Sequence, residues 1–312
     1  MLSVIIPTRN RPELLIGILD CISNQTRLPT EVIVVDSSSR VQNLNEDIKQ
    51  QLTIRYVHVN IQSAAEQRNI GIMNVDPKNN YIAFLDDDVM IDSDYFEKLI
   101  TFLDHENYIG VSGVVSRVEL EKSNFSKLKI ERIYKRLFLL DSKYEGKLLK
   151  SGINTPIFGR FNEPKEVEWL MGCSLWRSEI INKISFERDL RNQSLGEDVI
   201  FSHKARAYGK VAVVPTVRLN HSVSQIGRAN EVEFWTMWVQ NRYRLIQIMN
   251  GGQSKLAPYF WANLGQVILE VAKSLSLRNN DVRAAATIVK ESTKVFLNHF
   301  NTNSKSKFNP SR

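Results

Sequence analysis

The chain has 312 residues, of which 43% are hydrophobic, and a formal net charge of +7 at pH 7. This length exceeds that of a typical single domain, so we expect either one large domain with an appendage or two domains. Two cysteines, Cys21 and Cys173, are too few for a disulfide framework, which favours a reducing compartment. The positive charge suits partners that carry phosphate groups, although an ordinary soluble protein can be as basic.

The sequence predicts neither export nor a membrane span. The first residues lack a basic segment followed by an apolar one and instead have the pattern of a strand. The most apolar stretch, residues 258–275, is interrupted by polar and charged residues, so we do not expect it to cross a membrane. We therefore expect a cytoplasmic protein whose C-terminal helices could contact the inner face of the plasma membrane.

Residues 1–115 alternate short β-branched runs with amphipathic helical patterns. This alternation is typical of a layered α/β domain with parallel strands. Strands are expected at Leu2–Ile6, Glu31–Val35, Thr53–Val59, Tyr81–Leu85 and Ile109–Val115. Helices are expected at Pro12–Ile22, at Ala64–Val75 and after Ser93.

Three of these strands are followed by polar or acidic residues: Pro7–Arg11, Asp36–Ser39 and Asp86–Asp88. In open α/β sheets, ligands bind beyond the carboxyl ends of the strands. We therefore expect these three segments to converge at one ligand-binding edge.

The aspartate triplet Asp86, Asp87 and Asp88 is the most informative motif of the chain. On an extended backbone, Asp86 and Asp88 would share one side and converge on a cation, while Asp87 would face elsewhere. Oxygen ligands favour Mg²⁺ or Mn²⁺, and such ions are commonly completed by substrate phosphates. The triplet therefore points to a nucleotide diphosphate ligand. The alternative is a turn that leads into the helix after Ser93.

The second half of the chain has a less regular start. Residues 116–165 are rich in lysine and arginine and predict a loop-like insertion over the site. Gly196–Asp198 is expected to open a helix that Gly209 ends, and Val211–Pro215 is expected to be the last strand. Residues 226–303 are predicted to be helical, and residues 304–312 to be a disordered tail. The helical apolar stripes indicate core packing or, with their aromatic and basic neighbours, an interfacial surface.

Six motifs occur in order: Val4–Asn10, Val34–Asp36, Gln67–Gly71, Leu85–Val89, Met171–Ser174 and Gly196–Asp198. Together they resemble the motif series of family 2 glycosyltransferases with the GT-A fold, over residues 1–225. The resemblance implies an α/β fold, in which a Rossmann-like mixed sheet is flanked by helices and a C-terminal helical extension follows. Residues 1–115 would form the nucleotide-binding half, and residues 116–225 the acceptor half with its basic insertion.

The resemblance also assigns the donor site. It implies that the nucleotide sugar contacts Pro7, Thr8, Asn10, Arg11, Asp36, Arg68, Asn69, Asp86, Asp87, Gly172 and Cys173. Asp36 could accept the imide N–H of uracil or thymine, which favours a UDP or dTDP donor, or it could form an Asx-turn with the serines that follow. Arg68 could offset diphosphate charge, or it could be a surface residue of its helix.

The resemblance also implies the metal ligands and the catalytic base. Asp88 and Asp86 would bind Mn²⁺ or Mg²⁺, and His221 could add an imidazole nitrogen, although a histidine there could equally be structural. Asp198 would be the base that takes the proton of the acceptor hydroxyl, kept ionised by its helix N-terminus, unless it only caps that helix. Glu197 is the alternative base or, with Trp169, an acceptor contact.

The predicted function is a metal-dependent, inverting glycosyltransferase of polysaccharide biosynthesis, with a nucleotide-sugar donor and a glycan or lipid-linked glycan acceptor. One alternative is a nucleotide-sugar pyrophosphorylase, but Pro7–Asn10 lacks the glycines of its phosphate loop. Another is a non-catalytic scaffold, which would not need Asp36, Asp86, Asp88 and Asp198 together. Nucleic acid is not an expected partner, because the sequence has no recognised binding module.

Overall fold

The computed structural model describes residues 1–42, 44, 46–116, 125–190, 194–221, 229–251, 255–277 and 281–306. The chain forms two compact units. Unit 1 comprises Met1–Lys122, Glu145–Lys147 and Pro156–Arg228. Unit 2 comprises Ser123–Tyr144, Leu148–Thr155 and Ala229–Arg312.

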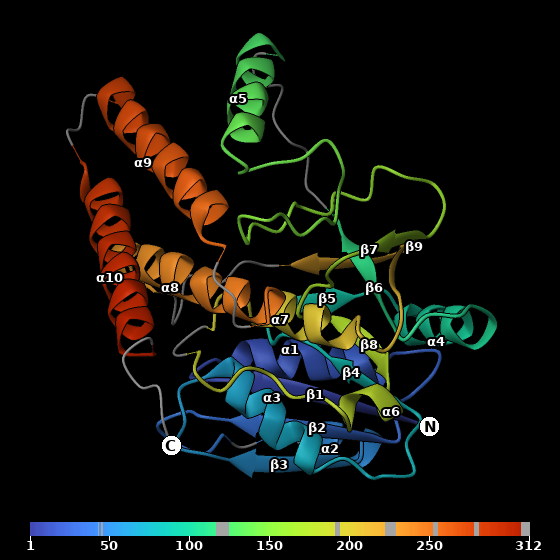
Figure 1. Ribbon diagram of the computed structural model, residues 1–312. Coiled ribbons are helices and arrows are strands. Elements are labelled where there is room, and N and C mark those ends of the chain that lie inside the picture. The colour runs from blue at the N-terminus through green and yellow to red at the C-terminus, as the bar shows by residue number, and fades with distance from the viewer. Residues whose placement is uncertain are drawn as a thin grey trace. The chain divides into compact units, whose positions relative to one another are not determined.

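Unit 1 is built on a mixed sheet (Figure 1). In the described part of the chain its order is β3-β2-β1-β4-β8-β6-β9-β5, with β7 paired to β9. The first four strands are parallel, and β8 runs antiparallel between β4 and β6. The strands are β1 (Leu2–Thr8), β2 (Glu31–Asp36), β3 (Ile54–His58), β4 (Tyr81–Phe84), β5 (Val89–Ile91), β6 (Gly110–Val115), β7 (Lys165–Val167), β8 (Ser174–Arg177) and β9 (Val211–His221).

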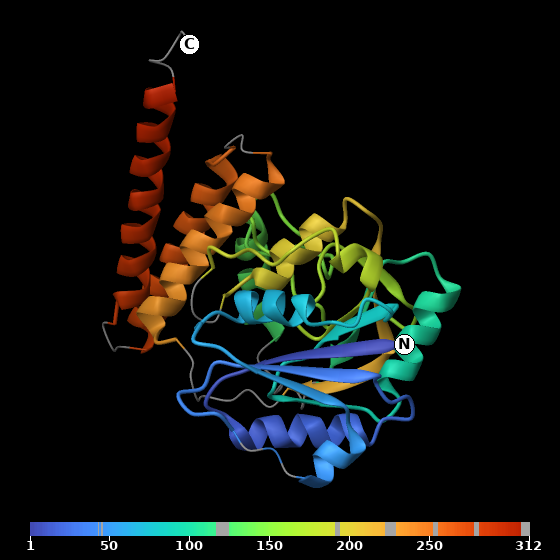
Figure 2. The same ribbon diagram turned by 90° about the horizontal axis from the view of Figure 1, so that it is seen from below.

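Helices cover both faces of this sheet. The alternation of side chains along β1 sends Val4 and Ile6 to one apolar cluster and Ile5 to another. The first cluster is closed by α1 (Pro12–Ser23), α2 (Glu46–Gln51) and α4 (Tyr95–His105), and the second by α3 (Ala64–Met73), α6 (Ser178–Ile181) and α7 (Glu197–Ala205). Figure 2 shows α1 and α3 on opposite faces of the sheet.

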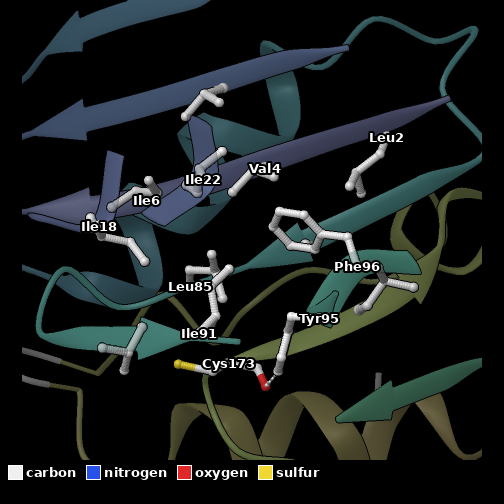
Figure 3. Packing of buried hydrophobic residues seen from close by; sticks show 14 of the residues in the cluster. Leu2, Val4, Ile6, Ile18, Ile22, Leu85, Ile91, Tyr95, Phe96 and Cys173 are labelled. Carbon is white, nitrogen blue, oxygen red and sulfur yellow. Dashed lines mark hydrogen bonds between the residues drawn. The ribbon is translucent and has the colours of Figure 1, made fainter. Parts of the chain in front are cut away.

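The first cluster packs directly behind the aspartate triplet. Leu2 and Val4 of β1 lie beside Phe96 of α4, and Ile6 lies beside Ile18 of α1, as Figure 3 shows. In the same cluster the Tyr95 hydroxyl donates to the Cys173 carbonyl at 3.3 Å. This buried packing holds the loop before β8 against the core, so the small residues of that loop have fixed positions.

Strand β9 is longer than predicted, and its length matters for the site. It pairs with β6 at residues 211–213 and, after a register shift between Ser112 and Val114, at residues 218–219. Gly113 lies at this irregularity, where an added Cβ would come within 2.6 Å of the Val217 carbonyl oxygen. The second half of β9 pairs with β5, so that His221 lies opposite Val89. Strand pairing thus brings His221 next to Asp88.

Unit 2 is helical and contains α5 (Phe125–Leu137), α8 (Glu231–Met249), α9 (Ala257–Leu277) and α10 (Arg283–Ser306). A capping box between Asn230 and Glu233 starts α8. The small apolar core of unit 2 includes Val239, Tyr259 and Ile288. None of the helices in the described ranges combines the length and the apolarity that a membrane span requires.

The predicted loop-like insertion differs from the structure. Residues 125–137 form α5, and this helix belongs to the same unit as the C-terminal helices. The cause is aromatic packing: the Phe138 and Trp261 rings stack with centroids 4.6 Å apart, and the Tyr134 hydroxyl donates to the Gly265 carbonyl at 2.7 Å. The predicted domain boundary at residue 225 therefore does not coincide with the division into units, because residues 123–144 and 148–155 belong to unit 2.

Other predicted elements changed less. Strands β1 to β4 and β6 agree with the predicted ones to within two residues. The sheet as a whole is mixed, as the family resemblance implied, because β8 enters it in the antiparallel direction. Helix α10 continues through Ser306, into the segment predicted to be disordered, and residues 307–312 lie outside the described residues.

Candidate active site

Three potential metal ligands lie together at the carboxyl edge of the sheet. One ligand atom each from Asp86, Asp88 and His221 lies within 4.8 Å of the others. Asp88 is buried, and its Oδ1 lies 3.0 Å from His221 Nε2. The two aspartates converge through a turn between β4 and β5, and not along an extended strand as the sequence analysis assumed.

Asp87 faces away from this group, as predicted. Its carboxylate accepts hydrogen bonds from Thr8 Oγ1 at 2.8 Å and from Arg11 Nη1 at 2.9 Å. Burial raises the pKa of the Asp87 carboxyl, while the Arg11 guanidinium acts in the opposite direction. Arg11 Nη1 also lies 3.6 Å from Asp88 Oδ2. Asp87 therefore ties the end of β1 to the metal-ligand turn.

Arg68 connects the metal-ligand turn to α7. Its side chain is 2% exposed and lies on α3, which Ser63 caps by accepting a hydrogen bond from the Glu66 amide. Arg68 Nη2 lies 2.5 Å from Asp86 Oδ1, and Nη1 forms a short ion pair with Glu197. Arg68 is thus a buried bridge between two acidic residues, rather than the surface residue that was the alternative prediction.

The bridge is not fully saturated with hydrogen bonds. Within the described residues, Arg68 Nε and Glu197 Oε2 are buried and have no hydrogen-bond partner. Arg68 also lies 5.6 Å from the ring centroid of Phe186, a cation–π distance. Because Glu197 is buried and paired with Arg68, it is a poorer candidate for a base than its neighbour Asp198.

Gly172 and Cys173 lie close to the ion pair between Arg68 and Asp86. A Cβ at Gly172 would lie 3.0 Å from Arg68 Nη2 and 3.2 Å from Asp86 Oδ2, so only glycine leaves both groups undisturbed. The buried Cys173 thiol donates to Asp86 Oδ2 at 3.8 Å. Burial, reinforced by the charge of Asp86, raises the pKa of this thiol well above its usual value. Cys173 is therefore a neutral neighbour of the metal-ligand turn.

Asp198 lies in the first turn of α7, after Gly196, whose φ of 85° is left-handed. Its carboxylate accepts a hydrogen bond from the Val199 amide at 2.8 Å. Burial raises the pKa of Asp198 to about 6, although that amide and the Arg68 charge oppose the rise. Desolvation, which was not expected, has a larger effect on this pKa than the helix N-terminus, but a pKa of about 6 still leaves the carboxylate mostly ionised near neutral pH.

Asp36 forms the predicted alternative, an Asx-turn. Its Oδ1 accepts hydrogen bonds from the amide and the hydroxyl of Ser38, and its other oxygen accepts one from the Tyr56 hydroxyl. The side chain is fully buried. Asn10, with a left-handed φ of 55°, lies beside this turn, and its Oδ1 accepts a hydrogen bond from the Ser39 amide at 3.0 Å.

Three predicted contacts lie deeper in the protein. Pro7 is buried within β1, opposite Val35 of β2. Asn69 does not face the metal-ligand turn, because its side chain exchanges two hydrogen bonds with the backbone of Phe186. Trp169 is only 9% exposed and belongs to the core. An acceptor contact from Trp169 would therefore involve little of its ring.

Sequence reasoning missed Gln67 as a positioning residue. Its buried amide donates to the Thr8 carbonyl at 2.9 Å and to the Val35 carbonyl at 2.7 Å. These carbonyls belong to the ends of β1 and β2, so Gln67 fixes the edge at which Thr8 and Asp36 lie. Its signal in the sequence is its place at the start of the Gln67–Gly71 motif, beside Arg68.

The donor set of Asp86, Asp88 and His221 fits a divalent metal ion. Two carboxylates and one imidazole are oxygen and nitrogen ligands of the kind that Mn²⁺ and related ions accept. Three protein ligands leave further coordination positions for water or phosphate oxygens. Both Asp86 and His221 are partly exposed, so these positions are reachable from solvent.

Curated relatives match the chain over parts of their length. An uncharacterized glycosyltransferase of Rickettsia felis is 32% identical over 138 residues, which are 44% of this chain and 22% of the relative. A chondroitin synthase of Pasteurella multocida is 26% identical over 254 residues, which are 74% of this chain and 26% of the relative. The chain spans only about a quarter or less of the length of these relatives.

Solved glycosyltransferase structures share the fold. The structure of S. aureus TarS 1–349 in complex with UDP-GlcNAc has a TM-score of 0.53 at 17% identity, covering 88% of this chain and 75% of that one. The mannosyltransferase PcManGT from Pyrobaculum calidifontis, in complex with GDP-Man and Mn²⁺, has a TM-score of 0.53 at 16% identity, covering 94% of this chain and 75% of that one. The predicted fold class is confirmed.

The family itself follows from the sequence match. The model of glycosyl transferase family 2 matches residues 3–162, just over half of the chain, and includes Asp36, Arg68 and the aspartate triplet. With a mixed sheet like that of solved glycosyltransferases, and with Asp86, Asp88 and His221 gathered at its edge, this chain belongs to glycosyl transferase family 2.

Proposed function

We propose that the chain is a metal-dependent, inverting glycosyltransferase that moves a sugar from a nucleotide-sugar donor to a hydroxyl group of a glycan. The single observation that carries this proposal is the grouping of Asp86, Asp88 and His221 within 4.8 Å, in a chain of this family. Such a group suits Mn²⁺ or Mg²⁺ together with a diphosphate. When bound, the ion supplies Lewis-acid neutralisation of charge on the leaving group.

The residues around this group would hold the donor. Arg11 lies at the carboxyl end of β1, beside Asp87 and Asp88, where its guanidinium can contact a phosphate oxygen. Gly172 leaves room for a ligand to approach Asp86 closely, because it adds no Cβ there. UDP and dTDP remain the favoured nucleotides. Both carboxylate oxygens of Asp36 already accept hydrogen bonds within the protein, so Asp36 would act on the nucleotide by fixing the conformation of the loop after β2.

Asp198 is the proposed base. An inverting transfer needs one carboxylate that takes the proton of the acceptor hydroxyl as that oxygen attacks the anomeric carbon. A carboxyl with a pKa of about 6 is mostly ionised at neutral pH and is a stronger base than an ordinary aspartate. Glu197 would act as a positioning residue through Arg68, and not as the base.

The acceptor is proposed to be a glycan or a lipid-linked glycan of a surface polysaccharide. Two of the curated relatives carry the name chondroitin synthase, from Escherichia coli and from Pasteurella multocida, and a synthase of that name builds a polysaccharide. A lipid-linked acceptor would place the protein at the inner face of the plasma membrane.

The test is donor turnover. The protein is incubated with UDP-, dTDP- and GDP-sugars and Mn²⁺, and released nucleoside diphosphate is measured with and without short glycan acceptors. Slow release without an acceptor, faster release with one, and loss of both in Asp88→Asn are expected. Asp92→Asn is the matched control, because Asp92 is an exposed carboxylate outside the metal-ligand group.

The outcomes separate the rival functions. A pyrophosphorylase would instead consume pyrophosphate and yield a nucleoside triphosphate and a sugar 1-phosphate. A non-catalytic scaffold would bind a nucleotide and turn nothing over. With an acceptor found, the anomeric configuration of the product decides the stereochemistry, and retention of the donor configuration would contradict a single-base mechanism through Asp198.

A further inference from the structure

The net positive charge of the chain comes from unit 2. The sequence of this unit has eighteen lysines and arginines against seven aspartates and glutamates, a net charge of +11. Unit 1 has twenty-three against twenty-seven, a net charge of −4. The predicted site is therefore carried by a weakly acidic unit, while the helical unit attracts polyanions.

Unit 2 also carries most of the exposed apolar side chains. Among the described residues, fifteen of the twenty-three exposed large hydrophobic side chains lie in this unit, which holds 114 of the 312 residues. Scattered exposed apolar residues are normal on a soluble protein. Their arrangement along a helix therefore decides whether they form a binding surface.

On α9 these residues form a stripe. Trp261, Leu264, Ile268 and Leu275 are 43%, 48%, 42% and 67% exposed. Their spacing of three, four and seven residues places them on one side of the helix. The opposite side is buried and includes Tyr259 at 0% exposure. Helix α9 thus has an apolar side turned to the solvent in addition to the side that packs into unit 2.

Helix α5 carries a second stripe, whose Leu137 end meets the first stripe at Trp261. Ile130, Ile133 and Leu137 are 73%, 60% and 64% exposed, again three and four residues apart. The two helices are fastened together, because Trp261 Nε1 donates to the Leu137 carbonyl at 2.8 Å. Exposed Arg132 lies between the residues of the α5 stripe in sequence. We call these seven apolar residues, four on α9 and three on α5, the α5–α9 surface.

We propose that the α5–α9 surface docks on a lipid bilayer that contains anionic lipids. An apolar helix side on a strongly basic helical unit is the combination that binds at a membrane interface without crossing it. Charge decides between a bilayer and a second copy of the chain. Two copies would bring together units of net charge +11 each, whereas an anionic bilayer attracts this charge. The inference does not depend on the transferase activity.

Vesicle sedimentation with the whole chain tests the proposal. Vesicles of phosphatidylcholine alone are compared with vesicles that also contain phosphatidylglycerol. The test variant is Leu264→Ser with Ile268→Ser, which removes two exposed side chains from the stripe. The matched control is Leu28→Ser with Met73→Ser, which removes two side chains that are 52% and 69% exposed from unit 1. Circular dichroism verifies that each variant is folded.

The wild type and the control are expected to bind the anionic vesicles, and the stripe variant to bind them at least about tenfold more weakly. Arg132→Gln with Arg136→Gln should weaken binding to the anionic vesicles and leave any binding to neutral vesicles unchanged. Raising the salt from about 0.1 M to about 1 M should weaken wild-type binding, because the Debye length falls from about 10 Å to about 3 Å.

Three results would overturn the proposal. One is a wild type that binds neither kind of vesicle. Another is a stripe variant that binds as well as the control. The third is a wild-type dimer in analytical ultracentrifugation that the stripe variant converts to a monomer without any vesicle binding, which would make this surface a contact between copies. Because vesicle binding is measured without a donor, its failure is distinguishable from a failure of the transferase function.

Discussion

Replacing Arg68 with methionine tests how the site is held together. Methionine keeps most of the aliphatic volume but removes the charge that pairs with Glu197 and Asp86. Glu197 is buried, at 7% exposure, and would keep an unpaired carboxylate, which typically costs about 3–5 kcal/mol. The Asp86 side chain is 35% exposed, so water can replace its partner, and we add only about 0–1 kcal/mol for it.

We therefore expect Arg68→Met to destabilise unit 1 by about 3–6 kcal/mol. The double variant Arg68→Met with Glu197→Met should recover most of this loss, because it leaves no buried charge unpaired. The assay is urea unfolding, with hydrogen–deuterium exchange of β1 and β4 as the local readout for unit 1. Arg55→Met is the control: its side chain is 53% exposed and its ion pair with Glu31 is 3.9 Å long.

Two results would refute this reasoning. A loss below about 1 kcal/mol in Arg68→Met would mean that Glu197 is solvated or protonated in the folded protein. A double variant as unstable as Arg68→Met would mean that packing, and not charge pairing, determines the effect.

Three further predictions concern other residues. Activity should rise as the pH passes upward through about 6, because Asp198 can accept a proton only when its carboxyl is ionised. Asp198→Asn should lose at least about a hundredfold in rate. The same variant should unfold at a higher urea concentration at neutral pH, because the buried, ionised carboxylate destabilises the folded protein. Gly172→Ala should weaken metal-dependent nucleotide binding, whereas Gly17→Ala, with open space around its Cβ, should leave binding intact in the same titration. Arg242→Ala should destabilise unit 2 by about 3 kcal/mol in thermal unfolding. The substitution removes the hydrogen bond that Arg242 donates to the buried Asn263 Oδ1 and the cation–π contact of Arg242 with the Trp238 ring.

The sequence predicted the first strands of the sheet well because their signal is local. Runs such as Leu2–Ile6 and Glu31–Val35 are β-branched, buried on both faces and bounded by polar residues, and the structure keeps them with small extensions. The three-residue β5 and the antiparallel β8 are too short to give a pattern. Their places depend on partners far along the chain, such as β9.

Local reasoning also grouped Asp86 and Asp88, but it could not supply the bridge through Arg68. That contact joins residues 129 positions apart, and no spacing rule predicts it. The Asp198 pKa shows the same limit, since a helix N-terminus is visible in the sequence and the burial that outweighs it is not. In unit 2, α5 joins the C-terminal helices through aromatic contacts that the sequence places more than a hundred residues apart.

The most direct test of a donor site at Asp86, Asp88 and His221 is calorimetric titration of UDP, dTDP and GDP with and without Mn²⁺. It compares the wild type, Asp88→Asn and the control Asp92→Asn. We expect one nucleotide to bind only when Mn²⁺ is present, and this binding to be lost in Asp88→Asn and kept in Asp92→Asn. Binding that is equal with and without Mn²⁺, or no binding of any nucleotide, would contradict the proposed metal-dependent donor site.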